Sequence, residues 1–236
     1  MKFSTLNKLQ TGATLMEVMI AMSISLVVTA SMIALMANSL GSTARIIQMT
    51  KLTDDLRVAM QMMSRDVRRS SYNANSMYCY KKSGCENVDE VTFAGDITLV
   101  DLDSDSVNDC LIFQMDRDKD GVSTTDGGGG FRRVFEGDVG VMEMWTSSSV
   151  EPDCQVDSGW VQITNPENMD IFGFSVDDNL SYTQLILDDG VDRISQRIRK
   201  VRMVMQGRLV LDPDITRQVE DTIAVRNDLL VKESST

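Results

Sequence analysis

The sequence predicts an α+β protein in which one long N-terminal helix precedes an antiparallel β-rich head. Apolar residues recur every three or four positions up to about residue 70, which is the period of an α-helix. Beyond residue 75 the period becomes two, and short apolar runs alternate with turn residues. With 236 residues, the chain is long enough to give such a head a hydrophobic core of its own.

Residues 13–40 form the first part of the predicted helix and are apolar enough to cross a membrane. They include no Pro, Lys, Arg or Asp, and their single acid is Glu17. About 20 apolar residues span the ~30 Å hydrocarbon core of a bilayer. A carboxylate costs at least ~2.5 kcal/mol at the centre of that core, so we expect a functional reason for Glu17. Lys2 and Lys8 precede the stretch, and the positive-inside rule therefore predicts a cytoplasmic N-terminus.

Residues 41–72 continue the predicted helix in amphipathic form. Apolar residues such as Leu56 and Met63 follow the helical spacing, and charged residues fill much of the opposite face. We expect the helix to end at Ser70–Asn73, because cations favour a helix C-terminus. Three arginines lie just before this point: Arg65, Arg68 and Arg69.

Residues 73–236 form the predicted head, which we expect to hold one antiparallel sheet or two. Gly127 to Gly130 are expected to be a turn. The candidate strands are 90–94, 97–101, 110–115, 131–136, 139–145, 159–163, 170–176, 182–187, 194–206 and 215–226.

The charge and composition favour a binding or structural protein over an enzyme. Lys and Arg number 23 against 35 Asp and Glu, giving a net charge of −12, which disfavours contact with nucleic-acid phosphates. The chain has no His, so the usual general base and the commonest metal ligand are both missing. We therefore expect no enzymatic activity and no required cofactor.

The four cysteines all follow the membrane segment, so the predicted orientation exports them to an oxidising compartment. Sequence alone allows three pairings of two disulfides. We favour a short Cys79–Cys85 loop together with Cys110–Cys154; buried free thiols are the alternative.

Acidic turns provide a candidate calcium site. Asp116, Asp118 and Asp120 precede Gly121 in the pattern that opens a calcium-binding loop. Residue 127 is Gly where an EF-hand has Glu, so an EF-hand is excluded. A solvated hairpin turn is the alternative. A second alternating set is Asp101, Asp103 and Asp105.

The N-terminus resembles the cleavage and methylation signal of type IV prepilins. The resemblance consists of the basic leader, Gly12, Thr14, Glu17 and the long apolar run; it departs at Ala13, where the family usually has Phe. It implies that prepilin peptidase removes residues 1–12 by cutting after Gly12, and that Ala13 becomes an N-methylated N-terminus. It also implies that Glu17 pairs with the N-terminal amine of a neighbouring subunit during assembly; pairing with the amine of its own chain is the alternative.

Parts of the helix and of the head resemble PilW-type minor pilins. The similar segments lie at 56–72 (LRVAMQMMSRDVRRSSY), 110–121 (CLIFQMDRDKDG), 201–209 (VRMVMQGRL) and 215–230 (ITRQVEDTIAVRNDLL). This resemblance implies a single-pass protein of the inner membrane with a periplasmic head. Such a subunit primes pilus assembly and stays at or near the tip, beside other minor pilins, the major pilin and the assembly platform. A GspJ-type pseudopilin of type II secretion is the nearest alternative, and an adhesive head on a plain membrane anchor is the third.

Overall fold

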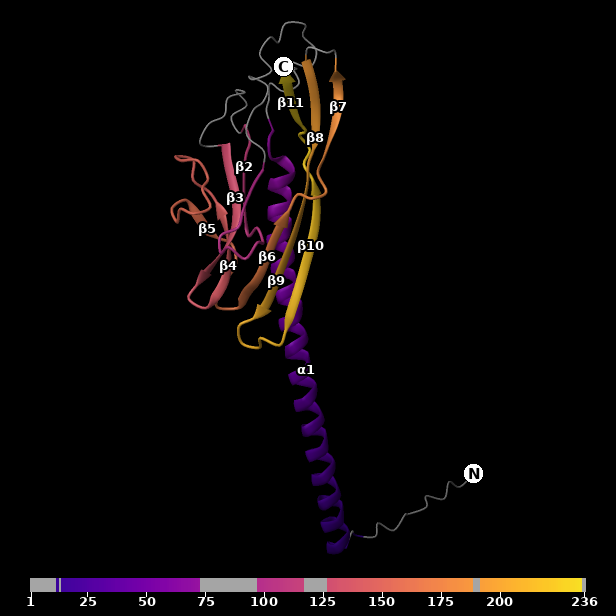
Figure 1. Ribbon diagram of the computed structural model, residues 1–236. Helices are drawn as coiled ribbons and strands as arrows, with labels where there is room; N and C mark the ends of the chain where they lie inside the picture. The colour runs from indigo at the N-terminus through magenta and orange to yellow at the C-terminus, as the bar shows by residue number, and fades with distance from the viewer. Residues whose placement is uncertain (1–11, 13, 73–96, 117–126, 189–191, 235–236) are drawn as a thin grey trace, which may run out of the picture. The chain divides into compact units, whose positions relative to one another are not determined.

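The computed structural model describes residues 12, 14–72, 97–116, 127–188 and 192–234 (Figure 1). By internal contacts the chain divides into two compact units, Met1–Gln48 and Met49–Thr236. In the described residues, the first unit contains only the beginning of the long helix. The second contains the end of that helix and all the strands.

The long helix predicted by the periodicity is confirmed as α1, Leu15–Arg69. It ends where the sequence indicated. The Ser70 N–H donates to the carbonyl of Val67 at 3.1 Å, and Ser71 takes a left-handed conformation with φ of 55°. A residue of this conformation commonly terminates a helix. The Ser71 N–H then donates to the carbonyl of Gln114, so the chain passes directly from the helix to the sheet.

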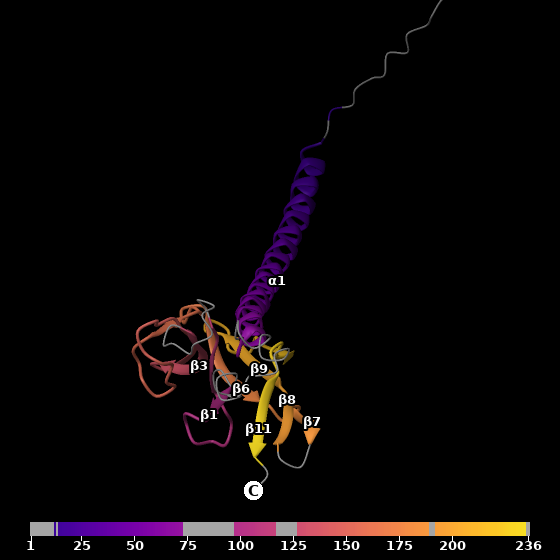
Figure 2. The same ribbon diagram turned by 90° about the horizontal axis from the view of Figure 1, so that it is seen from above.

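The described strands form three hydrogen-bonded antiparallel sheets, whereas the sequence suggested one or two. The first sheet has the order β1-β2-β3-β4-β5, the second β10-β9-β6 and the third β11-β8-β7. Figure 2 shows β7, β8 and β11 grouped together, apart from β1 and β3. The strands are β1 (Thr98–Val100), β2 (Cys110–Gln114), β3 (Gly128–Glu136), β4 (Val139–Trp145), β5 (Trp160–Gln162), β6 (Met169–Asp177), β7 (Tyr182–Asp188), β8 (Asp192–Ile198), β9 (Lys200–Leu209), β10 (Thr216–Ala224) and β11 (Leu229–Ser234).

Most predicted strands are found, but the turn expected at Gly127–Gly130 is wrong. Gly128 to Gly130 begin β3 and pair with β2. A side chain at Gly129 would place its Cβ 2.6 Å from the Phe113 ring, so glycine is needed for close packing at this position. The candidate strand at 90–94 lies outside the described residues.

The single strand predicted at 194–206 is also wrong, because it breaks at Arg199 into β8 and β9, which belong to different sheets. The Arg199 guanidinium is buried and donates to the Ser71 hydroxyl at 2.8 Å and to the carbonyl of Asn227. Asn227 in turn donates to the carbonyl of Ser70 at 3.0 Å. The sheet switch is thus bonded to the end of α1, a long-range contact with no signal in the local pattern.

The main core lies between the second half of α1 and the strands. Leu56 and Met63 from α1 are completely buried, together with Met203 and Met205 from β9 and Phe131 from β3. The end of α1 is also bonded to β10, since the Ser64 hydroxyl donates to Asp221 at 2.7 Å. In Figure 1 this part of α1 runs beside β6, β9 and β10.

A second, smaller core surrounds the disulfide Cys110–Cys154, which confirms one predicted pairing. The bond joins β2 to the connection between β4 and β5. Trp145 and Trp160 pack edge to face at 5.3 Å beside it, and the Arg132 guanidinium lies 4.6 Å from the Trp160 ring. Cys79 and Cys85 lie outside the described residues, so their pairing stays a prediction.

Candidate functional site

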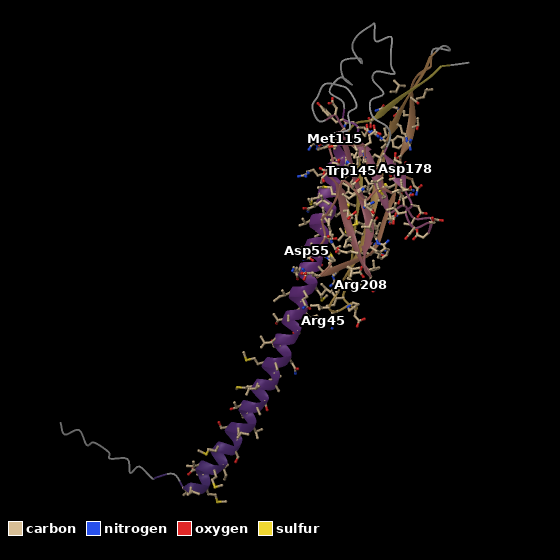
Figure 3. The ribbon with its side chains drawn as sticks, turned by 90° about the vertical axis from the view of Figure 1, so that its left-hand side faces the viewer. Arg45, Asp55, Met115, Trp145, Asp178 and Arg208 are labelled. Atoms are coloured by element: carbon tan, nitrogen blue, oxygen red, sulfur yellow. A yellow bond between two sulfur atoms is a disulfide. The ribbon has the colours of Figure 1, made fainter. Side chains whose placement is uncertain are left out.

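The first half of α1 has the surface expected of a membrane or assembly segment. From Leu15 to Gln48 every side chain is exposed, including Leu15 at 79% and Leu26 at 72%. The most apolar window of α1 has a mean hydropathy of 2.3, and none of it is buried. Figure 3 shows these side chains standing out all round the helix. Such a surface needs an apolar environment, which lipid or neighbouring helices can supply.

Several hydroxyl groups in this half are satisfied within the helix itself. The side chains of Ser23, Thr29 and Ser31 each donate to the carbonyl four residues earlier, at 2.7–2.8 Å. These bonds leave few polar groups facing outward and therefore reduce the cost of placing the helix in lipid.

Glu17 lies in the first turn of α1 and is exposed. Thr14 caps the helix: its hydroxyl accepts the Glu17 N–H at 3.3 Å, and its carbonyl accepts the same group at 3.0 Å. The spacing Thr-x-x-Glu is that of a capping box, a signal that the sequence analysis missed. The cap holds Glu17 at the third helical position, five residues after Gly12.

Gly12 is exposed, and a Cβ built on it would meet no atom within 4 Å. Its φ does not lie in the left-handed region. Neither packing nor backbone conformation therefore requires glycine at this position. Cleavage by an enzyme that accepts only a residue without a side chain would explain why this residue is glycine. Ala13 lies outside the described residues, so its methylation stays a prediction.

The acidic turn after β1 brings together the second acidic set of the sequence. Carboxylate oxygens of Asp101, Asp103 and Asp105 lie within 4.8 Å of one another. These carboxylates already organise the turn, since Asp101 accepts the N–H groups of Ser104 at 2.7 Å and Ser106 at 2.8 Å. Desolvation would raise the pKa of Asp101, but these backbone bonds outweigh it and hold that pKa below its usual value.

The first acidic set is only partly described. Asp116 is buried, and its N–H donates to the carbonyl of Tyr72 at 2.8 Å. Asp118 and Asp120 lie outside the described residues. Calcium binding at 116–120 therefore stays a prediction, which Ca²⁺-dependent thermal stabilisation of the protein and of its Asp118→Ala variant would test.

A long apolar helix ahead of an antiparallel β-rich head is the arrangement of type IV pilin-like proteins. The chain belongs to the family of prepilin peptidase-dependent protein B, whose family model matches residues 45–225. The chain is therefore a prepilin-type, pilin-like protein. The matched region begins after Gly12 and Glu17, so family membership is independent of the N-terminal signal. No curated protein and no solved structure matches the chain.

Proposed function

We propose that this protein is a minor pilin of the PilW type, which primes assembly of a type IV pilus and stays at or near its tip. The observation that carries the proposal is the environment of α1. One helix has a fully exposed apolar first half and a second half that belongs to the core of the head. Such a helix joins a folded head to an apolar environment that this chain does not itself provide.

Processing is the first step of the proposed function. Prepilin peptidase cleaves after Gly12, removing Lys2 and Lys8 with the leader and leaving the apolar helix on the mature chain. Ala13 then carries the new amine, which is methylated. In this scheme the protein is a substrate and a structural subunit, and it catalyses no reaction.

Docking is the second step, and we assign it to Glu17. An isolated carboxylate and an isolated amine are both costly in an apolar environment, and each offsets the cost of the other when they pair. Pairing of Glu17 with the N-terminal amine of a neighbour would therefore set the axial register of two helices. Small residues on α1, such as Ala21, Ala30 and Ala34, would allow close approach.

A tip position is favoured over the shaft because the head, residues 73–236, is bulky for a subunit repeated many times. The proposed partners are other minor pilins, the major pilin and the inner-membrane assembly platform, with the head in the periplasm.

The experiment is to measure the N-terminal mass of the protein isolated from the membrane fraction. We expect a chain that begins at methylated Ala13. Gly12→Val should retain Met1. The matched control is Gly41→Val, since Gly41 is likewise exposed with no atom near its Cβ position. A wild-type chain that still begins at Met1 would contradict the proposal.

The second measurement separates docking from processing. Glu17→Val should be cleaved normally but should fail to initiate filaments, whereas normal initiation by this variant would contradict the role of Glu17. Pilin-like proteins that co-purify with the wild type identify the assembly: pilus subunits support the proposal, and type II secretion subunits support the GspJ-type alternative.

A further inference from the structure

Four exposed arginines gather at the C-terminal end of α1. Arg65, Arg68 and Arg69 follow the spacing i, i+3, i+4, so they share one face of the helix. Arg226 comes from the connection between β10 and β11, and its N–H donates to the carbonyl of Arg68 at 3.1 Å. We call these residues the arginine cluster: Arg65, Arg68, Arg69 and Arg226.

Few acidic groups among the described residues neutralise the arginine cluster, although the chain has a net charge of −12. Arg65 lies 3.3 Å from Asp66, in a surface pair of the kind that contributes little. In the described part of the chain, no carboxylate forms an ion pair with Arg68, Arg69 or Arg226. The helix dipole accounts for cations in the last turn of α1, but it does not account for Arg226.

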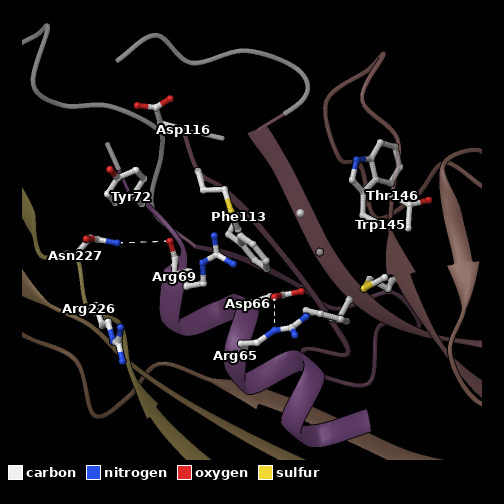
Figure 4. Close-up of a pocket in the computed structure, with 15 residues that line it drawn as sticks. Arg65, Asp66, Arg69, Tyr72, Phe113, Asp116, Trp145, Thr146, Arg226 and Asn227 are labelled. Carbon is white, nitrogen blue, oxygen red and sulfur yellow. Dashed lines mark hydrogen bonds and ion pairs between the residues drawn. The ribbon is translucent and has the colours of Figure 1, made fainter. Parts of the chain in front are cut away.

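A cavity of about 720 Å³ opens beside the arginine cluster (Figure 4). Arg65, Arg69 and Arg226 line it, and Figure 4 shows the Phe113 ring and the Arg69 guanidinium in the same hollow. Its apolar lining also includes Phe131 and Met144. This volume lies in the range of sites that take a ligand group of substantial size.

Among the described residues that line this cavity, two are acids, and neither forms an ion pair with Arg69 or Arg226. Asp66 is already paired with Arg65. Asp116 is buried at 4% exposure and is engaged in contacts within the chain. Among the described residues, no other carboxylate lines the cavity, so its cationic side can accept a carboxylate from a partner.

We propose that this cavity docks an acidic segment of a partner protein, which sets its carboxylates against Arg69 and Arg226. Guanidinium groups bind carboxylates with directional, charge-assisted bonds. The inference rests on the proposed assembly function only for the expectation that the partner is another pilin-like subunit.

A protein segment fits better than a nucleic acid. Bases would need exposed ring faces on which to stack, but Phe113 is 3% exposed and Phe131 is fully buried. The net charge of −12 also repels a phosphate backbone at long range.

The test is photo-crosslinking in cells from the full-length protein, with benzoylphenylalanine in place of Tyr72. Tyr72 lines the cavity and is 39% exposed. Tyr182 on β7, 51% exposed, is the matched control position because it is not among the residues that line the cavity. We expect position 72 to capture one protein, through a peptide that carries Asp or Glu, and position 182 not to capture it.

Charge reversal then tests the chemistry. Arg69→Glu and Arg226→Glu should each lower the crosslink yield about tenfold, whereas Arg226→Lys should retain most of it. Unchanged yields after reversal, a captured peptide without carboxylates, capture of nucleic acid only, or equal capture from position 182 would each overturn the proposal.

Two controls keep the result interpretable. Thermal unfolding followed by tryptophan fluorescence shows whether each variant folds. If Arg226→Glu does not fold, the crosslink yield is measured for Arg226→Gln and for the wild type in about 0.5 M NaCl, and both should be lower. An unchanged yield overturns the proposal. Cleavage after Gly12 is measured in the same cells. Loss of cleavage speaks against the proposed function, whereas loss of the crosslink with cleavage intact speaks against the docking site alone.

Discussion

The two halves of α1 share one helical backbone but have opposite environments. In the first half, Leu15 to Gln48, every side chain is exposed. In the second half, the apolar positions Leu52, Leu56 and Met63 are at most 1% exposed. The two halves also differ in their number of charged residues. The first half has only Glu17 and Arg45, whereas the second has a charged residue in nearly every turn.

The comparison shows that a periodic apolar pattern predicts a helix but does not identify what packs against the apolar surface of that helix. In the second half the apolar stripe is narrow and the sheets cover it. In the first half the apolar surface runs all round the helix, so its partner must surround it, as lipid or a bundle of helices does.

The largest difference in stability between the two halves should appear when one leucine in each is replaced by alanine. Leu56→Ala should lower the free energy of unfolding of the head by about 3–5 kcal/mol, because it leaves a cavity in the core. Leu35→Ala, at a position 70% exposed, should leave that free energy unchanged. Urea unfolding in detergent, followed by the fluorescence of Trp145 and Trp160, measures both. Equal losses in the two variants would contradict the division of α1.

Removal of the disulfide tests the head alone. Cys154→Ala with Cys110→Ala should lower the free energy of unfolding by about 2–4 kcal/mol, since the bond closes a loop of 44 residues. The same urea titration measures the loss. Membrane association should not change, because the disulfide lies outside the first half of α1, and release of the double variant from membranes would count against the comparison.

A smaller difference is expected between two serines of α1. Ser64 is 6% exposed and bonded to Asp221 on β10, so Ser64→Ala should cost about 1–2 kcal/mol by leaving that carboxylate without its donor. Ser31 donates only to its own helix, and Ser31→Ala should cost about 0.5 kcal/mol or less. Chemical denaturation measures the free energy of unfolding of the two variants. A larger loss of that free energy for Ser31→Ala than for Ser64→Ala would contradict the prediction.

The smallest effect concerns pH and the outer face of β9 and β10. A hydrogen bond from Arg202 at 2.8 Å lowers the pKa of Glu220 below its usual value of 4.5. The folded state therefore binds fewer protons at this site than the unfolded state. The contribution of the pair to stability is fully present above about pH 4.5 and is lost as the pH falls through the lowered pKa.

Glu220→Gln should accordingly lose less thermal stability than the wild type between about pH 6 and about pH 3. Glu136→Gln on β3 is the matched control, because in the described residues no ion pair involves Glu136. The melting temperature at each pH is the measurement. The same acid response in wild type and Glu220→Gln would show that the pair contributes nothing.

Much of the fold could be predicted because its signals are local. The α1 helix follows from a 3.6-residue period that continues without proline to Arg69, and β4 follows from alternation over Val139–Trp145. Processing at Gly12 and docking by Glu17 were also inferred from a short motif, and they stay predictions that the experiments above test.

The wrong predictions concern contacts between distant residues. Gly128 to Gly130 resemble a turn in sequence. They are part of a strand because they pair with β2 and because the rings of Phe113 and Pro152 pack closely against them. The break at Arg199 depends on Ser71 and Asn227, which lie 128 and 28 residues away along the chain. The cavity and arginine cluster were missed for the same reason, since Arg226 joins the other arginines only through folding.

The sequence by itself determined which elements form and where the apolar segment of α1 lies, because helical and strand periods and hydropathy are properties of neighbouring residues. Only the tertiary structure decided which residues of α1 are buried, how the strands divide among sheets, and which distant arginines come together. These depend on contacts between residues far apart in the chain, whose free energy becomes available only when the head has folded.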